Sequence, residues 1–139
     1  MKFEINNGFS GEILFSLETE NIKLCLEAAV KSNTYLRGAD LGGADLGGAY
    51  LRGAKISDDI TIVQAPIIIS GFIWLVIIWD NHMQIGCEFH SHNEWIGFDD
   101  AAWIRMGGKE AAIFKKENML SLELFCRLQS DRANKLKNE

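Results

Sequence analysis

A five-residue repeat in residues 34–58 constrains the fold of this chain more than any other feature. The segment reads TYLRG, ADLGG, ADLGG, AYLRG and AKISD, so a large aliphatic residue recurs at every fifth position. A helix would place its apolar residues three and four apart, and a strand would place them two apart. A period of five therefore predicts a chain that turns a corner after each unit. The aliphatic side chains would point inward, and successive turns would stack as in a solenoid.

These units resemble the pentapeptide-repeat family, whose repeat is A(D/N)LXX and whose fold is a right-handed, four-sided β-helix. Ala39-Asp40-Leu41 and Ala44-Asp45-Leu46 match that repeat in full. The neighbouring units keep the aliphatic residue and replace the Asp by Tyr or Lys. Since four units form one coil in the family, the resemblance implies one short quadrilateral coil with two open faces. Open faces expose backbone groups and Leu side chains, so the flanking sequence is expected to cap them.

The residues before the repeat predict a hairpin followed by a helix. Apolar and polar residues alternate on both sides of Asn7-Gly8, which is typical of a β-hairpin. Residues 20–32 predict an amphipathic helix with Thr19 as its N-cap. This helix would cover the N-terminal face of the coil. Its apolar stripe has helical spacing and consists of Ile22, Cys25, Leu26, Ala29 and Val30.

Residues 60–79 contain no charged side chain and are long enough to span a bilayer as a helix. Pro66 and Gly71 interrupt the run, and its many β-branched residues favour strands. We therefore predict buried strands at residues 60–63, 67–69 and 72–79, and we expect no membrane partner.

Helices are expected to complete the chain. Ser91 and Glu94 have the spacing of a capping box, and the helix that they begin would end at Gly107-Gly108. Asp99 and Asp100 are interpreted as acids that stabilise a helix N-terminus. A last helix is predicted over residues 109–135. The residues predicted to form its buried side are Ile113, Met119, Leu120, Leu124 and Leu128.

The predicted fold class is thus α+β, with three segments that together form one compact domain. Residues 1–33 form the strand-helix cap, residues 34–58 the pentapeptide-repeat coil, and residues 59–139 the later strands and helices. This plan is also similar to small pentapeptide-repeat proteins predicted in phages and prophages.

Charge and cysteine content restrict the function and the compartment. The formal net charge is −5, from 19 acids and 14 bases, and the bases form no stripe. Direct binding of nucleic acid is not expected, because it requires clustered Lys and Arg. The three cysteines are widely spaced and no signal peptide is visible, so we expect free thiols in the reducing cytoplasm of a bacterial host.

Cys87, His90 and His92 form the one dense group of potential metal ligands. Zinc uses such side chains, and a thiol beside an imidazole can act as a nucleophile. However, no second Cys/His pair follows at the spacing of a zinc finger. We therefore expect no metal, no cofactor and no enzymatic activity. A metal-binding or thiol enzyme that uses these three residues is the alternative.

The family resemblance implies a binding function. Long members imitate DNA with rows of acids and occupy proteins such as gyrase. One coil is only about 4.8 Å high, which is too short to reproduce the charges of a duplex. We expect contact with a protein through exposed aromatic and acidic residues around the repeat. The candidates are Tyr35, Asp40, Asp45, Tyr50, Asp58, Asp59, Glu18 and Glu20.

The expected partner is a host protein or ribonucleoprotein complex. The most specific hypothesis is an anti-CRISPR protein that binds a Cas effector, with acids of the surface supplying partial DNA mimicry. A gyrase-directed pentapeptide-repeat protein is the alternative. The oligomeric state does not follow from the sequence.

Overall fold

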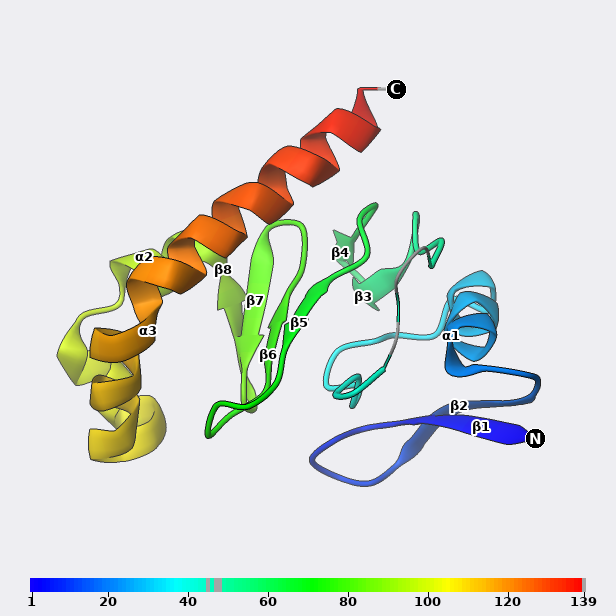
Figure 1. The fold of residues 1–139 in the computed structure, drawn as a ribbon, viewed down its shortest axis with the longest axis horizontal. Coiled ribbons are helices and arrows are strands. Elements are labelled where there is room, and N and C mark those ends of the chain that lie inside the picture. The colour runs from blue at the N-terminus through cyan, green and yellow to red at the C-terminus, as the bar shows by residue number, and fades with distance from the viewer. Residues whose placement is uncertain (45, 47–48, 139) are drawn as a thin grey trace.

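The computed structural model describes residues 1–44, 46 and 49–138, and its elements form three layers (Figure 1). The first layer holds the N-terminal hairpin, the first helix and the repeat. A four-stranded sheet forms the middle layer, and the last two helices cover its other face. In chain order the elements are β1 (Lys2–Asn6), β2 (Ile13–Glu18), α1 (Ile22–Lys31), β3 (Lys55–Ser57), β4 (Ile60–Thr61), β5 (Ile67–Ile69), β6 (Val76–Ile78), β7 (His82–Ile85), β8 (Glu88–Ser91), α2 (His92–Gly97) and α3 (Asp100–Lys137).

The predicted hairpin and first helix are confirmed. Strands β1 and β2 pair antiparallel, and the side-chain oxygen of Asn7 accepts from the amides of Phe9 and Ser10 in the connecting loop. The N-cap of α1 is Asn21, so the prediction of Thr19 is wrong. The Asn21 carboxamide accepts from the amide of Leu24, three residues on, as an N-cap should. The predicted stripe of α1 faces inward, with Cys25, Leu26 and Ala29 buried and Ile22 and Val30 packed beside them.

The repeat segment turns once per unit. In four units the amide of the small first residue donates to the carbonyl of the aliphatic residue three positions earlier, at 2.9–3.1 Å (Ala39 to Leu36, Ala44 to Leu41, Ala49 to Leu46 and Ala54 to Leu51). The predicted inward orientation of the aliphatic residues is confirmed, because each is 7% exposed or less: Leu36, Leu41, Leu46, Leu51 and Ile56. The chain also returns on itself, since the Leu36 amide donates to the Lys55 carbonyl at 3.0 Å.

The repeat contains less sheet than expected. Within the described part of residues 34–54 there is no regular strand. Strand β3 pairs antiparallel with β4 instead of continuing a parallel wall. The mixture of helices and antiparallel sheets agrees with the predicted α+β class, whereas a quadrilateral coil is not confirmed.

The middle sheet has the order β5-β6-β7-β8 and every pair is antiparallel. Its strand β6 is buried on both faces. Ile77 packs in one core with the repeat leucines, while Val76 and Ile78 pack in a second core with Trp95 and Trp103. Burial on both faces explains why the last part of the uncharged run, residues 76–79, carries no charge. No helix in the described ranges is long and apolar enough to cross a membrane.

The third predicted strand begins later than expected. Residues 71–74 form bends instead of a strand, and Gly71 has a φ of 101°, which interrupts extended pairing. The chain becomes regular only at Val76, so the predicted start at Phe72 is wrong.

The capping box at Ser91 is confirmed, with reciprocal bonds between Ser91 and Glu94. The predicted single helix up to Met106 is wrong, because α2 ends at Gly97 and Asp99 caps a new helix by accepting from the Ala102 amide at 2.8 Å. The predicted break at Gly107-Gly108 is present as non-helical backbone within α3.

The predicted buried side of the last helix is wrong. Ile113, Leu120, Leu124 and Leu128 are 55%, 78%, 59% and 48% exposed, and only Met119 of that set is buried. The helix buries a different face, formed by Ala111, Phe114, Met119, Leu122, Cys126, Gln129 and Ala133. Both faces have helical spacing, so periodicity alone could not choose between them.

Because β6 is buried on both faces, we expect truncation of Ile77 to lower the stability of the fold strongly. Ile77→Ala should lower the free energy of unfolding by about 2–5 kcal/mol, because it leaves a cavity under the repeat. The matched control is Ile73→Ala, whose side chain is 62% exposed, and it should change stability by less than about 0.5 kcal/mol. Urea denaturation checks both. Equal effects of the two substitutions would contradict this packing.

Candidate interaction surface

The hairpin tip and the first repeat unit face strands β7 and β8 across two adjoining hollows, which we call the central cleft. One hollow is lined by Phe9, Tyr35, Arg37 and Phe89 among others. The second hollow shares Phe9, Gly38 and Gln84 with the first and extends to Asp40 and Ile73. The cleft therefore combines residues that are up to 80 positions apart in the sequence.

Backbone hydrogen bonds hold the hairpin wall of the cleft against the repeat. The Gly8 amide donates to the Gly38 carbonyl at 2.8 Å, and the Asp40 amide donates to the Asn6 carbonyl at 2.7 Å. Gly38 has a φ of 77°, and a Cβ there would lie 2.8 Å from the Asn7 side-chain nitrogen. Only glycine meets both conditions, so the close approach of these two segments depends on this residue.

Arg37 is the central charged group of the cleft. Its guanidinium lies over the Phe89 ring, 4.8 Å from the ring centroid, in a cation–π contact. Phe89 is itself stacked on His82 with a centroid distance of 5.2 Å. Among the described residues no salt bridge involves Arg37. A cation–π contact uses the positive charge of the guanidinium and does not require its N–H donors, so these can donate to a bound acceptor.

Exposed aromatic side chains border Arg37. Phe9 is 58% exposed and Tyr35 is 46% exposed. The Tyr35 hydroxyl donates to the Asp58 carboxylate, and this hydrogen bond raises the pKa of Tyr35 above its ordinary value. Tyr35 is therefore a neutral, oriented side chain at the rim of the cleft.

Two of the predicted interaction residues, Tyr35 and Asp40, line the cleft, and Asp58 is hydrogen-bonded to Tyr35. The Asp40 carboxylate accepts from the Gly42 amide at 3.2 Å, so it partly serves the local turn. Sequence reasoning missed Phe9, Arg37 and Phe89. Arg37 offered a signal, since a repeat position otherwise held by small residues carries Arg here and at Arg52.

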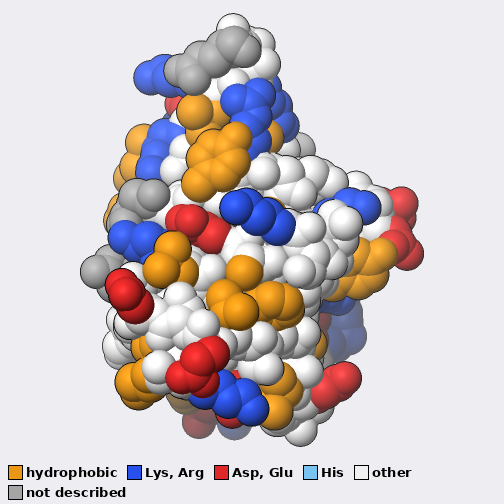
Figure 2. Space-filling model, turned by 90° about the vertical axis from the view of Figure 1, so that its right-hand side faces the viewer, with side chains coloured by type: hydrophobic (Ala, Val, Ile, Leu, Met, Phe, Trp, Pro, Cys, Tyr) orange, Lys and Arg blue, Asp and Glu red, His pale blue; other side chains and the backbone are white. Residues whose placement is uncertain are grey.

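Four of the other predicted interaction residues do not line the cleft, namely Tyr50, Glu18, Glu20 and Asp59. Tyr50 is 69% exposed, and its amide donates to Glu27 on α1. Glu18 pairs with the N-terminal ammonium at 2.8 Å, and Glu20 and Asp59 are exposed. Asp45 lies outside the described residues. On the face that α1 and the N-terminus present, acids alternate with bases and hydrophobic groups and form no row (Figure 2).

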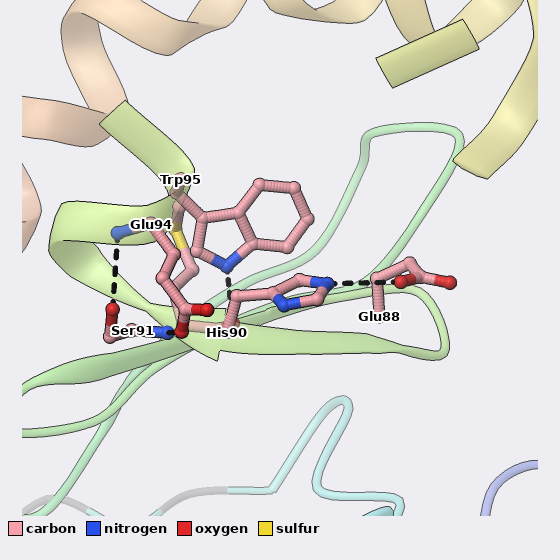
Figure 3. A network of polar contacts seen from close by, with 6 residues as sticks. Glu88, His90, Ser91, Glu94 and Trp95 are labelled. Carbon is pink, nitrogen blue, oxygen red and sulfur yellow. Dashed lines mark hydrogen bonds and ion pairs between the residues drawn. The ribbon is translucent and has the colours of Figure 1, made fainter. Parts of the chain in front are cut away.

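The group Cys87, His90 and His92 is divided by the fold. His92 is buried, with Nε2 3.0 Å from the His82 carbonyl and Nδ1 3.2 Å from Ser130 Oγ. The His90 ring extends toward Glu88, with 3.0 Å between Nε2 and the carboxylate, beside Trp95 (Figure 3). Cys87 is exposed at the β7–β8 turn. Within the described ranges no three His, Cys, Asp or Glu side chains are placed to hold a metal.

The other two thiols lie in the interior. Burial raises the pKa of Cys25, and it raises the pKa of Cys126 to about 12. Both therefore remain protonated and unreactive at neutral pH.

Asp80 is a further buried polar residue, and its role is structural. Its two carboxylate oxygens accept from the amides of Val63 and Gln64 at 2.9 and 3.2 Å. These bonds satisfy backbone donors in the connection between β4 and β5, so Asp80 is no candidate for chemistry.

Comparison with known proteins identifies the repeat segment. The family model described as "Pentapeptide repeats (8 copies)" matches residues 32–58, which include Tyr35, Arg37, Asp40 and Asp58. Searches of curated proteins and of solved structures gave no match. The family match thus concerns the repeat and says nothing of a viral origin or of a partner.

The buried histidines predict a loss of stability in mild acid. Burial lowers the pKa of His92, and also that of His82, so the folded protein favours the neutral rings. Unfolded histidine takes up a proton near pH 6.5. Stability is therefore complete above about pH 6.5 and decreases as the pH falls toward the lower folded-state pKa.

Thermal denaturation at pH 7.5 and pH 5.5 measures this effect. The melting temperature should fall with pH, and His92→Gln should reduce the size of that fall although it lowers the starting value. His90→Gln is the matched control, since this partly exposed ring lies on the same strand-helix segment. An unchanged fall in His92→Gln would show that His92 does not set the pH dependence.

Proposed function

We propose that the protein is a non-enzymatic binding protein that engages a protein partner at the central cleft. The observation that supports this is the cation–π contact of Arg37 with Phe89, in a hollow that the exposed rings of Phe9 and Tyr35 also line. Arg and Tyr are enriched among the residues that dominate binding energy at protein interfaces. The match of residues 32–58 to the pentapeptide repeats also favours an interaction role.

The cleft suits binding because its walls are fixed before a partner arrives. Gly38 and the hairpin bonds hold one wall, and the paired strands β7 and β8 form the other. Side chains that are already oriented lose less entropy when they bind. The edge of the Arg37 guanidinium would bind a carboxylate or carbonyl oxygen of the partner, with apolar groups on Phe9 and Tyr35.

Catalysis is not part of this proposal. Both ring nitrogens of His92 are within hydrogen-bond distance of groups of the fold, and His90 Nε2 faces Glu88. The alternative of a thiol or metal enzyme would need at least one of these rings to be directed at Cys87 or at a shared ion.

Within the binding class, our specific hypothesis is an inhibitor of a nucleic-acid machine in the bacterial cytoplasm. An anti-CRISPR protein that binds a Cas effector is motivated by small size, by the net charge of −5, and by the likeness of the plan to small phage proteins. The net charge favours a basic protein surface as partner. DNA mimicry is the less favoured mode of contact, because Asp40 and Asp58 already accept local hydrogen bonds.

The repeat supplies its own control for this proposal. Arg37 and Arg52 occupy the same place in their units, TYLRG and AYLRG, and both are exposed, but only Arg37 lies in the cleft. Arg37→Ala should weaken partner binding at least about tenfold, as expected for a central Arg. Arg52→Ala should leave it unchanged, and Arg37→Lys should also weaken it because the planar stacking group is lost.

Affinity capture from a bacterial lysate, followed by titration of the recovered protein, measures these effects. Purified Cas effectors and gyrase are tested in parallel, with interference in cells and DNA supercoiling as readouts. Equal losses for Arg37→Ala and Arg52→Ala would place the contact outside the cleft. Unimpaired interference together with no recovered Cas component would reject the anti-CRISPR hypothesis, and unaffected supercoiling would reject gyrase.

A further inference from the structure

The outer face of α3 carries a row of exposed aliphatic side chains. Ile113, Leu120, Leu124 and Leu128 are 55%, 78%, 59% and 48% exposed, and they lie opposite the face that packs on the sheet. Single apolar residues are common on surfaces, whereas several of them on one face of a helix favour an interaction site. Figure 1 shows the C-terminal half of this helix running along the edge of the molecule.

The spacing of this face is that of a coiled-coil seam. Positions 113, 117, 120, 124, 127 and 131 are separated by alternating steps of four and three, an average of about 3.5 residues. The two central positions are Leu120 and Leu124. Glu117 and Arg127 flank them, one on each side, and both are exposed. Among the described residues neither forms a salt bridge.

We propose that this seam pairs with the same seam of a second copy, with the two helices antiparallel. A two-fold axis at the height of residue 122 places Leu120 of each copy against Leu124 of the other. The same axis places Glu117 of each copy against Arg127 of the other, so two acid–base layers lie next to the leucines, and it sets Ile113 against Asp131 in the outermost layers. Such a contact is isologous and closes at a dimer.

The charges of Glu117 and Arg127 favour an antiparallel over a parallel pair of α3 helices. A parallel pair in register would bring Glu117 against Glu117 and Arg127 against Arg127, and like charges facing each other in a seam are destabilising. The antiparallel pair removes both repulsions. It also brings Glu110 close to Lys135 of the other copy, which adds a further acid–base pair at each end.

A shallow groove beside the seam extends the contact. Phe72 and Ile73 line it together with Ile113 and Glu117, so it is continuous with the apolar row. In the antiparallel pair, Leu128 of the other copy lies at the height of residue 116, next to this groove. The groove would therefore cover Leu128, the one leucine of the row that is off the seam.

Sedimentation velocity of the full chain over a range of concentrations tests the dimer. The wild type should show about twice the mass of one chain. Leu120→Lys with Leu124→Lys should weaken association by about a hundredfold or more, since two leucines per copy lose their burial. Circular dichroism should be unchanged, because both side chains are exposed in the monomer. A monomeric wild type would overturn the proposal and assign the row to another protein.

Charge reversal tests the pairing itself. Glu117→Arg and Arg127→Glu should each weaken the dimer, and the double variant should restore it, because the acid–base layers are then re-formed with opposite sign. A dimer that is insensitive to these substitutions and to the leucine substitutions would place the contact elsewhere.

Disulfide cross-linking tests the direction. In a Cys87→Ser background, a mixture of the Glu117→Cys and Arg127→Cys chains should form a cross-linked heterodimer, while each chain alone should not cross-link. Cross-linking of either chain with itself would show parallel helices and overturn the proposed arrangement.

Discussion

The structure depends on covering the row of aliphatic side chains that the repeat turns inward. A solenoid normally buries such a row by stacking further coils, and a repeat of five units has too few of them. Other elements therefore supply the missing contacts. Helix α1 contributes Cys25, Leu26 and Ala29 to the same core, strand β6 contributes Ile77, and Trp79 follows directly after this strand. The three segments of the chain are thus joined around one short repeat.

Covering the repeat in this way also creates the central cleft. The hairpin is bonded to the repeat through Gly8 and Gly38, and the sheet packs on the repeat through Ile77. Between these two attachments lies a hollow that Arg37 and Phe89 line. Helix α3 lies on the opposite side of the sheet from the repeat (Figure 1). Ile73 lines both the cleft and the groove beside the seam, so pairing would reach one end of the cleft and leave the hollow at Arg37 and Phe89 open. A pair would then present two clefts and gain avidity toward a partner with repeated sites.

Sequence patterns predicted those parts of the fold that depend on interactions between residues close together in the sequence. The period of five predicted that the leucines point inward, and Asn7-Gly8 predicted the hairpin. The spacing of Ser91 and Glu94 predicted the start of a helix. The cleft was not predictable, because the contact between Arg37 and Phe89 joins positions far apart in the sequence. The prediction of which face of α3 is buried was wrong for a related reason. This helix has two apolar faces, and the break at Gly107-Gly108 and the sheet determine which one packs inward.

Strand β6 connects the two cores of the molecule through a single short segment of backbone. Alternate side chains of residues 76–79 enter different cores, so a loss of either core would expose one side of the strand to water. The side chains that cover one face of the paired strands β5, β6 and β7 would then be lost. We therefore expect the repeat side and the helical side to be coupled in folding, so that the three layers unfold together in a single step.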